Sequence, residues 1–276
     1  MNKTKLTAYA AAVLAALCMS FAFTGCSGKD SPSPEKPGEP DEPERVETAG
    51  TENGWQDGTD TDAGADQGPE VIEPVTDRDG NVYQVIKIGT QYWTVSNLAV
   101  RTFNDGTAIP LVEDDTQWYD RGESGEAACC LFRNDPANGE AYGLLYNWHA
   151  VTSDKLCPEG WHVPTAGEFG LLIDLYGGKE EAGAALKSTS GWKGFGGDEN
   201  PEYQGDNRSG FTGLPSGYRS GEDGAFLNLG QYGYWWTASE VNELQADCIY
   251  VYYNKPLAYT ITPPKRGGYP VRCVRY

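Results

Sequence analysis

The chain has 276 residues and a formal net charge of −19, because 40 acidic residues outweigh 21 lysines and arginines. An excess of negative charge repels polyanions, so the sequence predicts no nucleic-acid partner. Apolar residues make up 39% of the chain, which is enough for one folded domain with a sizeable core.

The first 25 residues have the pattern of a bacterial lipoprotein signal peptide. Two lysines precede an apolar run at 8–23, and small residues separate this run from Cys26. We expect residues 1–25 to be removed and Cys26 to be lipidated, so that acyl chains hold the protein to a membrane. An ordinary signal peptide with an unrelated cysteine is the alternative. Ser27, rather than aspartate, follows the cysteine, which favours export to the outer membrane. We expect the domain to lie at the cell surface.

A linker rich in Pro, Gly, Glu and Asp follows the predicted lipidation site. Residues 27–74 contain fourteen acidic and three basic residues and almost no large apolar ones. Such a segment cannot bury enough surface to offset its ordering entropy, so we expect 26–74 to be a disordered tether. The folded domain is then predicted at 75–276. No later apolar stretch approaches the roughly 20 residues that a membrane-spanning helix needs.

The domain begins with signals for strands and continues with signals for helices. Alternating residues at 82–88 and 92–95 predict a β-hairpin that follows a turn at 79–81. Thr165 and Glu168 have the spacing of a capping box, and helical apolar spacing follows until two glycines end the pattern at 177–178.

A second short helix is predicted at 180–187, and the chain then turns to strands. Five strands are predicted at 212–218, 234–238, 248–253, 257–261 and 271–274. Two helices combined with short, mostly antiparallel strands make the predicted fold class α+β.

Five segments carry a family resemblance. They are TDRDGNVYQVIKIGTQYWTVSNLAVRTFNDGTAIP at 76–110, LCPEGWHVPTAGEF, SGFTGLPSGYRS, GYWWTASE and YPVRCVRY. Together they resemble the Fibrobacter succinogenes major paralogous domain. The resemblance implies a secreted C-type-lectin-like domain, distantly similar to the sulfatase-modifying (formylglycine-generating) fold. It also implies that the first and last strands meet, and that 188–209 is an irregular long-loop region.

The cysteines are interpreted partly through this resemblance, which implies a disulfide between Cys157 and Cys273. Cys129, Cys130 and Cys248 stay unassigned. One of the two vicinal cysteines can pair with Cys248, which would leave an odd thiol.

A formylglycine-generating enzyme would need a reactive cysteine pair and a metal such as copper. The cysteines of this chain do not fall in that catalytic motif, so we expect them to be structural and predict no catalytic residue. His149 and His162 are each preceded by tryptophan and are expected to be packed or half-buried rather than a metal pair. The acidic residues of the long loop are expected to be solvated rather than to bind Ca²⁺. We therefore expect no metal site and no cofactor.

Aromatic residues in or beside loops are the candidates for ligand binding, because tyrosine and tryptophan offer large amphipathic surfaces at small entropic cost. The candidates are Trp192, Tyr203, Tyr218, Arg219 and Tyr232. The expected function is a cell-envelope lipoprotein whose domain binds or adheres to a glycan or protein outside the cell. The alternatives are an enzyme of the sulfatase-modifying type and a purely structural envelope protein.

Overall fold

The structure is a computed structural model, and it describes residues 71–276. The predicted signal peptide, Cys26 and the linker up to residue 70 lie outside the described residues. The first strand, β1, begins at Val71, which is earlier than the predicted start of the domain at Val75. Helices and antiparallel strands are mixed in the fold, so the α+β class is confirmed.

A four-stranded antiparallel sheet joins the two ends of the described chain. Its strand order is β1-β2-β3-β11. The strands are β1 (Val71–Thr76), β2 (Val82–Ile88), β3 (Gln91–Thr94) and β11 (Val274–Arg275). The predicted hairpin is present as β2 and β3, which pair antiparallel. The last strand, β11, joins the same sheet as the first strand but pairs with β3, so the expected meeting of the first and last strands is found only as membership of one sheet.

A three-stranded antiparallel sheet forms the second layer, with the order β10-β9-β8. Two small sheets, β4-β5 and β6-β7, complete the strands. The bounds are β4 (Cys129–Cys130), β5 (Leu145–Tyr146), β6 (Ser216–Arg219), β7 (Phe226–Leu229), β8 (Tyr232–Glu240), β9 (Ala246–Tyr252) and β10 (Ala258–Ile261). The sequence predicted β6, β8, β9 and β10, with shifted bounds. It did not predict β4, β5 and β7.

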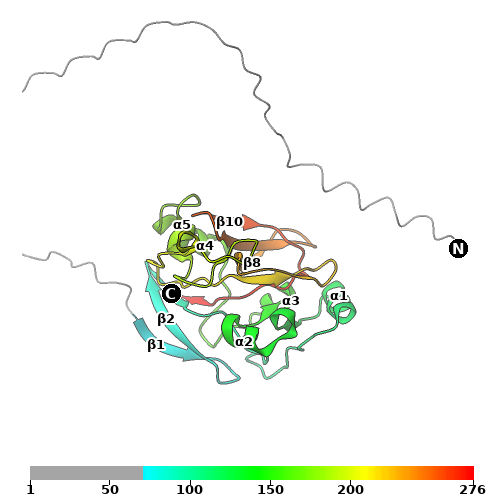
Figure 1. The fold of residues 1–276 in the computed structure, drawn as a ribbon. Helices are drawn as coiled ribbons and strands as arrows, with labels where there is room; N and C mark the ends of the chain where they lie inside the picture. Colours follow the sequence, from blue (N-terminus) through cyan, green and yellow to red (C-terminus); the bar gives the residue numbers. More distant parts are fainter. Residues whose placement is uncertain (1–70) are drawn as a thin grey trace, which may run out of the picture. The chain divides into compact units, whose positions relative to one another are not determined.

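Five α-helices and two 3₁₀ turns occur in the described chain. They are α1 (Asp115–Glu123), η1 (Phe132–Asn134), α2 (Pro136–Tyr142), α3 (Trp148–Val151), α4 (Ala166–Leu175), α5 (Ala182–Leu186) and η2 (Pro201–Tyr203). The predicted helices are α4 and α5, and the capping box of Thr165 and Glu168 is present. The sequence did not predict α1, α2 and α3. Helices α4 and α5 lie at one end of the domain and α1, α2 and α3 at the other (Figure 1).

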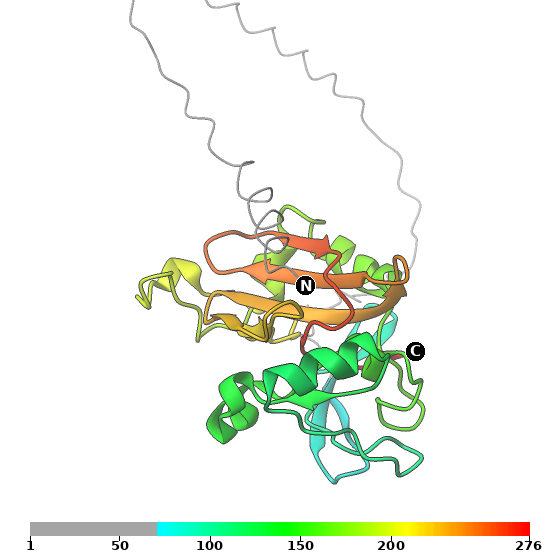
Figure 2. The ribbon, with the colours of Figure 1, turned by 90° about the vertical axis from the view of Figure 1, so that its right-hand side faces the viewer.

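One apolar core lies between the two larger sheets and α4. Trp93 of β3 packs against Phe169 of α4, with ring centroids 4.9 Å apart, and Trp235 of β8 belongs to the same buried cluster. A second core lies on the other side of β8, where Trp236 packs against Tyr269. In the view of Figure 2 the orange three-stranded sheet lies above the green helices α1, α2 and α3. None of the helices within 71–276 is long and apolar enough to cross a membrane.

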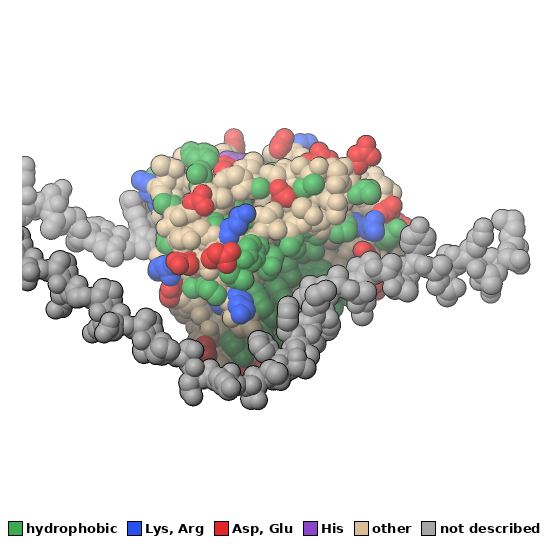
Figure 3. Space-filling view, turned by 90° about the horizontal axis from the view of Figure 1, so that it is seen from above, with side chains coloured by type: hydrophobic (Ala, Val, Ile, Leu, Met, Phe, Trp, Pro, Cys, Tyr) green, Lys and Arg blue, Asp and Glu red, His purple; other side chains and the backbone are tan. Residues whose placement is uncertain are grey.

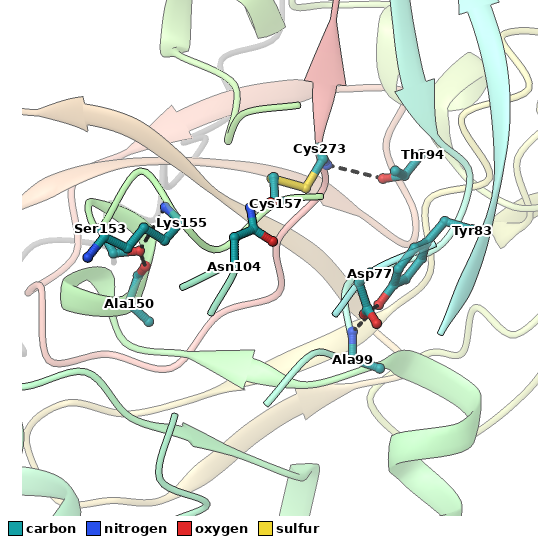
Figure 4. The surroundings of a disulfide bond; sticks show 10 residues. All are labelled: Asp77, Tyr83, Thr94, Ala99, Asn104, Ala150, Ser153, Lys155, Cys157 and Cys273. Carbon is teal, nitrogen blue, oxygen red and sulfur yellow. Dashed lines mark hydrogen bonds between the residues drawn. A yellow bond between two sulfur atoms is a disulfide. The ribbon is translucent and has the colours of Figure 1, made fainter. Parts of the chain in front are cut away.

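The predicted disulfide between Cys157 and Cys273 is confirmed. It joins the segment ahead of α4 to the residue just before β11 (Figure 4). The backbone N–H of Cys273 donates to the hydroxyl of Thr94, at the end of β3, so the final strand is held by a covalent bond and by hydrogen bonds.

We expect Cys273→Ser to destabilise the full chain strongly. The two cysteines are 116 residues apart in sequence, and closing a loop of this length stabilises a fold by about 4 to 5 kcal/mol in the chain-entropy model. Urea unfolding under non-reducing conditions measures the change. Cys129→Ser is the control and should cost less, because Cys129 has no disulfide to lose. Equal losses in the two variants would contradict the prediction.

Candidate functional site

Tyrosines gather on one face of the three-stranded sheet. Side chains on a strand alternate between its two faces, and directly opposed residues in an antiparallel pair share a face. Tyr232 is opposite Tyr252, and Tyr234 is opposite Tyr250, which is in turn opposite Tyr259 of β10. Together with Tyr218 of β6, whose ring packs against Tyr234, these residues form what we call the tyrosine face.

The rings of the tyrosine face stack on one another. Tyr232 lies between Tyr234 and Tyr252, with centroid distances of 5.5 and 4.4 Å and interplanar angles of 11° and 26°. Tyr218 stacks on the buried Tyr269 at 5.1 Å and 1°. Because the ring faces pack against each other, the sheet presents mainly ring edges and hydroxyl groups to solvent. Tyr234 is buried, and the other members of the face are half-buried.

Four of the six tyrosine hydroxyls of this face divide into two groups. Two of them are bound within the domain, and two make no hydrogen bond to any residue in 71–276. The hydroxyl of Tyr234 accepts from Asn228, and that of Tyr259 donates to Glu180. The Tyr218 and Tyr250 hydroxyls are the two without an internal partner, and burial raises the pKa of both groups. Both stay protonated at neutral pH and can donate to a ligand.

Carboxylates lie beside the tyrosine face, and the nearby Lys193 is paired with the carboxylate of Glu199. Glu222 and Asp223 lie near enough to Tyr218 to raise its pKa further, and Glu180 binds the hydroxyl of Tyr259. Lysines and arginines cover aromatic rings elsewhere in 71–276, but none lies over a ring of the tyrosine face. The local potential therefore disfavours anionic ligands.

Side chains of the hydrophobic colour class, which includes tyrosine, gather on part of the surface seen from above the domain (Figure 3). The long loop adds a further aromatic side chain at one end of the tyrosine face. Phe195 is 65% exposed, and its ring lies 6.4 Å from Tyr252 and 5.7 Å from Tyr253.

Two of the predicted ligand-binding residues, Trp192 and Arg219, have fully buried side chains, so the structure does not place them on an open surface. The indole N–H of Trp192 donates to Ser188, and the Lys187 ammonium lies 5.2 Å from its ring. Arg219 follows Tyr218 on β6 and therefore points to the opposite side of the strand. Its guanidinium donates to the carbonyl oxygens of Val112 and Glu113 and to the carboxylate of Asp115.

The other three candidates, Tyr203, Tyr218 and Tyr232, are partly exposed. The structure brings Tyr218 and Tyr232 together on the tyrosine face, since both rings contact Tyr234. Tyr203 of η2 lies at the edge of this region, where its ring meets Tyr253 at 4.7 Å and 90°.

Sequence reasoning missed Tyr250, Tyr252, Tyr259 and Phe195 as candidates. The signal that indicates the first three is a period of two in tyrosine along consecutive strands, at 232 and 234, at 250 and 252, and at 259. Strand register is needed to join these positions into one face.

The three remaining cysteines are free and buried. The possible disulfide to Cys248 is therefore wrong, and Cys129 and Cys130 are separate thiols as well. Burial raises the pKa of Cys129 and Cys130 to about 12, and it also raises that of Cys248. A thiol with such a pKa has almost no thiolate at neutral pH, so none of the three is an activated nucleophile.

The histidines do not form a pair either. His149 is half-buried and contacts the carbonyl oxygen of Gly122, whereas the exposed His162 contacts the carboxylate of Glu168 at 2.7 Å. Within residues 71–276 no three His, Cys, Asp or Glu side chains are placed to hold a metal ion.

Two larger sheets, a disulfide between Cys157 and Cys273, and a partly open tyrosine face thus characterise this α+β domain. The family model of the Fibrobacter succinogenes major domain matches residues 86–275, so the chain belongs to that family. No curated protein and no solved structure matches the chain.

We expect the three free cysteines to react slowly with a thiol reagent in the native protein at neutral pH. Burial and the raised pKa both keep the thiolate form scarce. Thiol titration of the full chain with its signal peptide removed should show all three only after unfolding. A fast-reacting pair in the folded protein would contradict this assignment.

Proposed function

We propose that the protein is a cell-envelope lipoprotein whose domain binds a glycan or protein ligand outside the cell. The observation that carries this proposal is the tyrosine face, where hydroxyl groups without internal partners lie beside partly exposed rings. Tyrosine is favoured at binding surfaces because its rigid ring contributes area and its hydroxyl contributes hydrogen bonds. Tyr218, Tyr232 and Tyr250 pack against the core with part of their surface, and the part left open is available to a ligand.

The sequence supports the envelope part of the proposal. The apolar run at 8–23 and the small residues before Cys26 are typical of a lipoprotein signal, and an acidic linker separates that cysteine from the domain. The linker would hold the tyrosine face away from the lipid surface. We propose the outer membrane as the location, with the domain at the cell surface.

We also propose that the domain is C-type-lectin-like, distantly similar to the sulfatase-modifying fold. The meeting of β3 and β11 and the disulfide from Cys157 to Cys273 support this assignment. The sheet and the disulfide then form a scaffold, and the long loop at 188–209 contributes Phe195 to one edge of the binding surface.

An enzyme of the sulfatase-modifying type is the alternative, and it requires an accessible reactive thiol pair. Cys129 and Cys130 are adjacent, but both are fully buried and have raised pKa values. A purely structural envelope protein would need neither a reactive thiol nor an open tyrosine face. The observed surface favours the binding module over both alternatives.

We expect Tyr218→Phe and Tyr250→Phe to weaken ligand binding about two- to tenfold each, since each removes one hydrogen bond worth about 0.5 to 1.5 kcal/mol. Neither hydroxyl has an internal partner, so the free energy of unfolding should change by less than about 0.5 kcal/mol. The measurement is binding of the full chain in detergent to immobilised glycans and extracellular-matrix proteins.

The matched control is Tyr119→Phe, which makes the same chemical change on the exposed surface of α1. It should bind like the unmodified protein. The proposal fails if both tyrosine-face variants bind every captured probe normally, or if a folded protein captures no probe at all.

The anchor gives a separate prediction. We expect Cys26→Ser to abolish incorporation of radiolabelled fatty acid and to leave an uncleaved or soluble precursor, because the thiol that carries the lipid is absent. Because we propose that the domain lies at the cell surface, protease treatment of intact cells should remove it from the unmodified protein. A domain that resists protease until the cells are broken would contradict the surface location.

A further inference from the structure

We propose that the ligand of the tyrosine face is an uncharged glycan chain and that Phe195 is a platform on which one of its sugar rings stacks. This inference rests on the proposed function, because it assigns a ligand class and a specificity residue to the same surface. It depends on three features: the way in which Phe195 is displayed, its position, and the charge around the tyrosine face.

A tight turn displays Phe195. The backbone N–H of Gly197 donates to the carbonyl oxygen of Gly194, and Gly194 donates in turn to Asp198. Gly197 has a φ of +80°, a conformation that L-residues rarely adopt, and Lys193 forms an ion pair with Glu199 at the base of the turn. The turn is therefore held by its own hydrogen bonds and does not need the phenyl ring for its shape.

The phenyl ring of Phe195 has a large surface open to a ligand. Phe195 is 65% exposed, although burying such a side chain fully would contribute about 1.5 to 3 kcal/mol. Its ring meets that of Tyr253 at 86°, so the contact is T-shaped and much of the phenyl surface stays open. The open surface suits the apolar C–H side of a sugar ring.

The position of Phe195 extends the tyrosine face at one end. Tyr252, the ring nearest to Phe195 in that face, stacks on Tyr232. A chain ligand that lay on Phe195 would continue over the hydroxyl-bearing edges of these tyrosines. The opposite end of the same strands, at the turn between β8 and β9, carries no tyrosine.

The carboxylates near the tyrosine face indicate which class of ligand the face favours. Carboxylates of Glu222, Asp223 and Glu180 lie beside the tyrosines, so sulfated or uronic-acid glycans and anionic lipids are disfavoured. A cationic peptide would gain from these carboxylates, but the ring faces that bind cations are occupied by stacking. Phenol hydroxyls and carboxylates together match a ligand rich in neutral hydroxyl groups.

The experiment compares binding of the full chain in detergent to immobilised neutral, sulfated and uronic-acid glycans. We expect binding to neutral glycans, a loss of about tenfold in Phe195→Ala, and recovery in Phe195→Trp, which restores a stacking surface. Leu244→Ala is the matched control, because Leu244 is 71% exposed at the turn between β8 and β9. It should bind normally, and all three variants should unfold like the unmodified protein.

Preference for the anionic glycans, or normal binding by Phe195→Ala, would overturn the inference. Capture of protein probes alone, weakened by Tyr218→Phe and Tyr250→Phe, would overturn it while leaving the proposed function intact. If those two variants bound every captured probe normally, or if no probe were captured, the proposed function would fail together with the inference.

Discussion

The buried guanidinium of Arg272 is the interaction on which the arrangement of the two sheets depends. It donates to the side-chain oxygen of Asn97 and to the carbonyl oxygens of Thr94, Phe211 and Thr212. The same oxygen of Asn97 accepts the indole N–H of Trp235, so one amide links the end of β3 to β8. Burial lowers the pKa of Arg272 to about 9, which leaves the group charged at neutral pH. A buried charge costs several kcal/mol of desolvation, and here four hydrogen bonds to loop and strand-end acceptors offset part of that cost.

The same arrangement occurs twice more, at Lys187 and at Arg219. The Lys187 ammonium donates to the carbonyl oxygens of Tyr203 and Tyr253 and lies over the ring of Trp192. Arg219 lies over Trp118 and Phe226 while it binds the segment ahead of α1. Long irregular segments leave many carbonyl groups without strand or helix partners, and buried cations satisfy several of them at once. Aromatic rings beside each cation offset part of its desolvation.

Contacts such as those of the buried cations join residues that are far apart in sequence, and this separates the parts of the fold that could be predicted from those that could not. Local patterns were sufficient for the hairpin of β2 and β3 and for the capping box of α4, because those signals lie within a few residues of one another. Helix α1 buries only Trp118, α2 buries no residue, and α3 has four residues, so helical spacing of apolar residues could not reveal them. The burial of Trp192 and Arg219 was not predicted, because a position in or beside a loop does not show whether the side chain has a partner inside the domain. The tyrosine face needed the register of three strands, which no local pattern contains.

One face of β8 changes from core to surface along its length. Trp236 is buried against Tyr269 and donates its indole N–H to the carbonyl oxygen of Tyr146. Two and four residues earlier, Tyr234 and Tyr232 lie on the same side of the strand but progressively closer to solvent. These tyrosines are therefore a continuation of the packed core, and their stacked rings would lose little conformational freedom on binding the proposed ligand. Preorganisation of this kind lowers the entropic cost of association, so a surface built mainly from ring edges and hydroxyls can bind without a deep pocket.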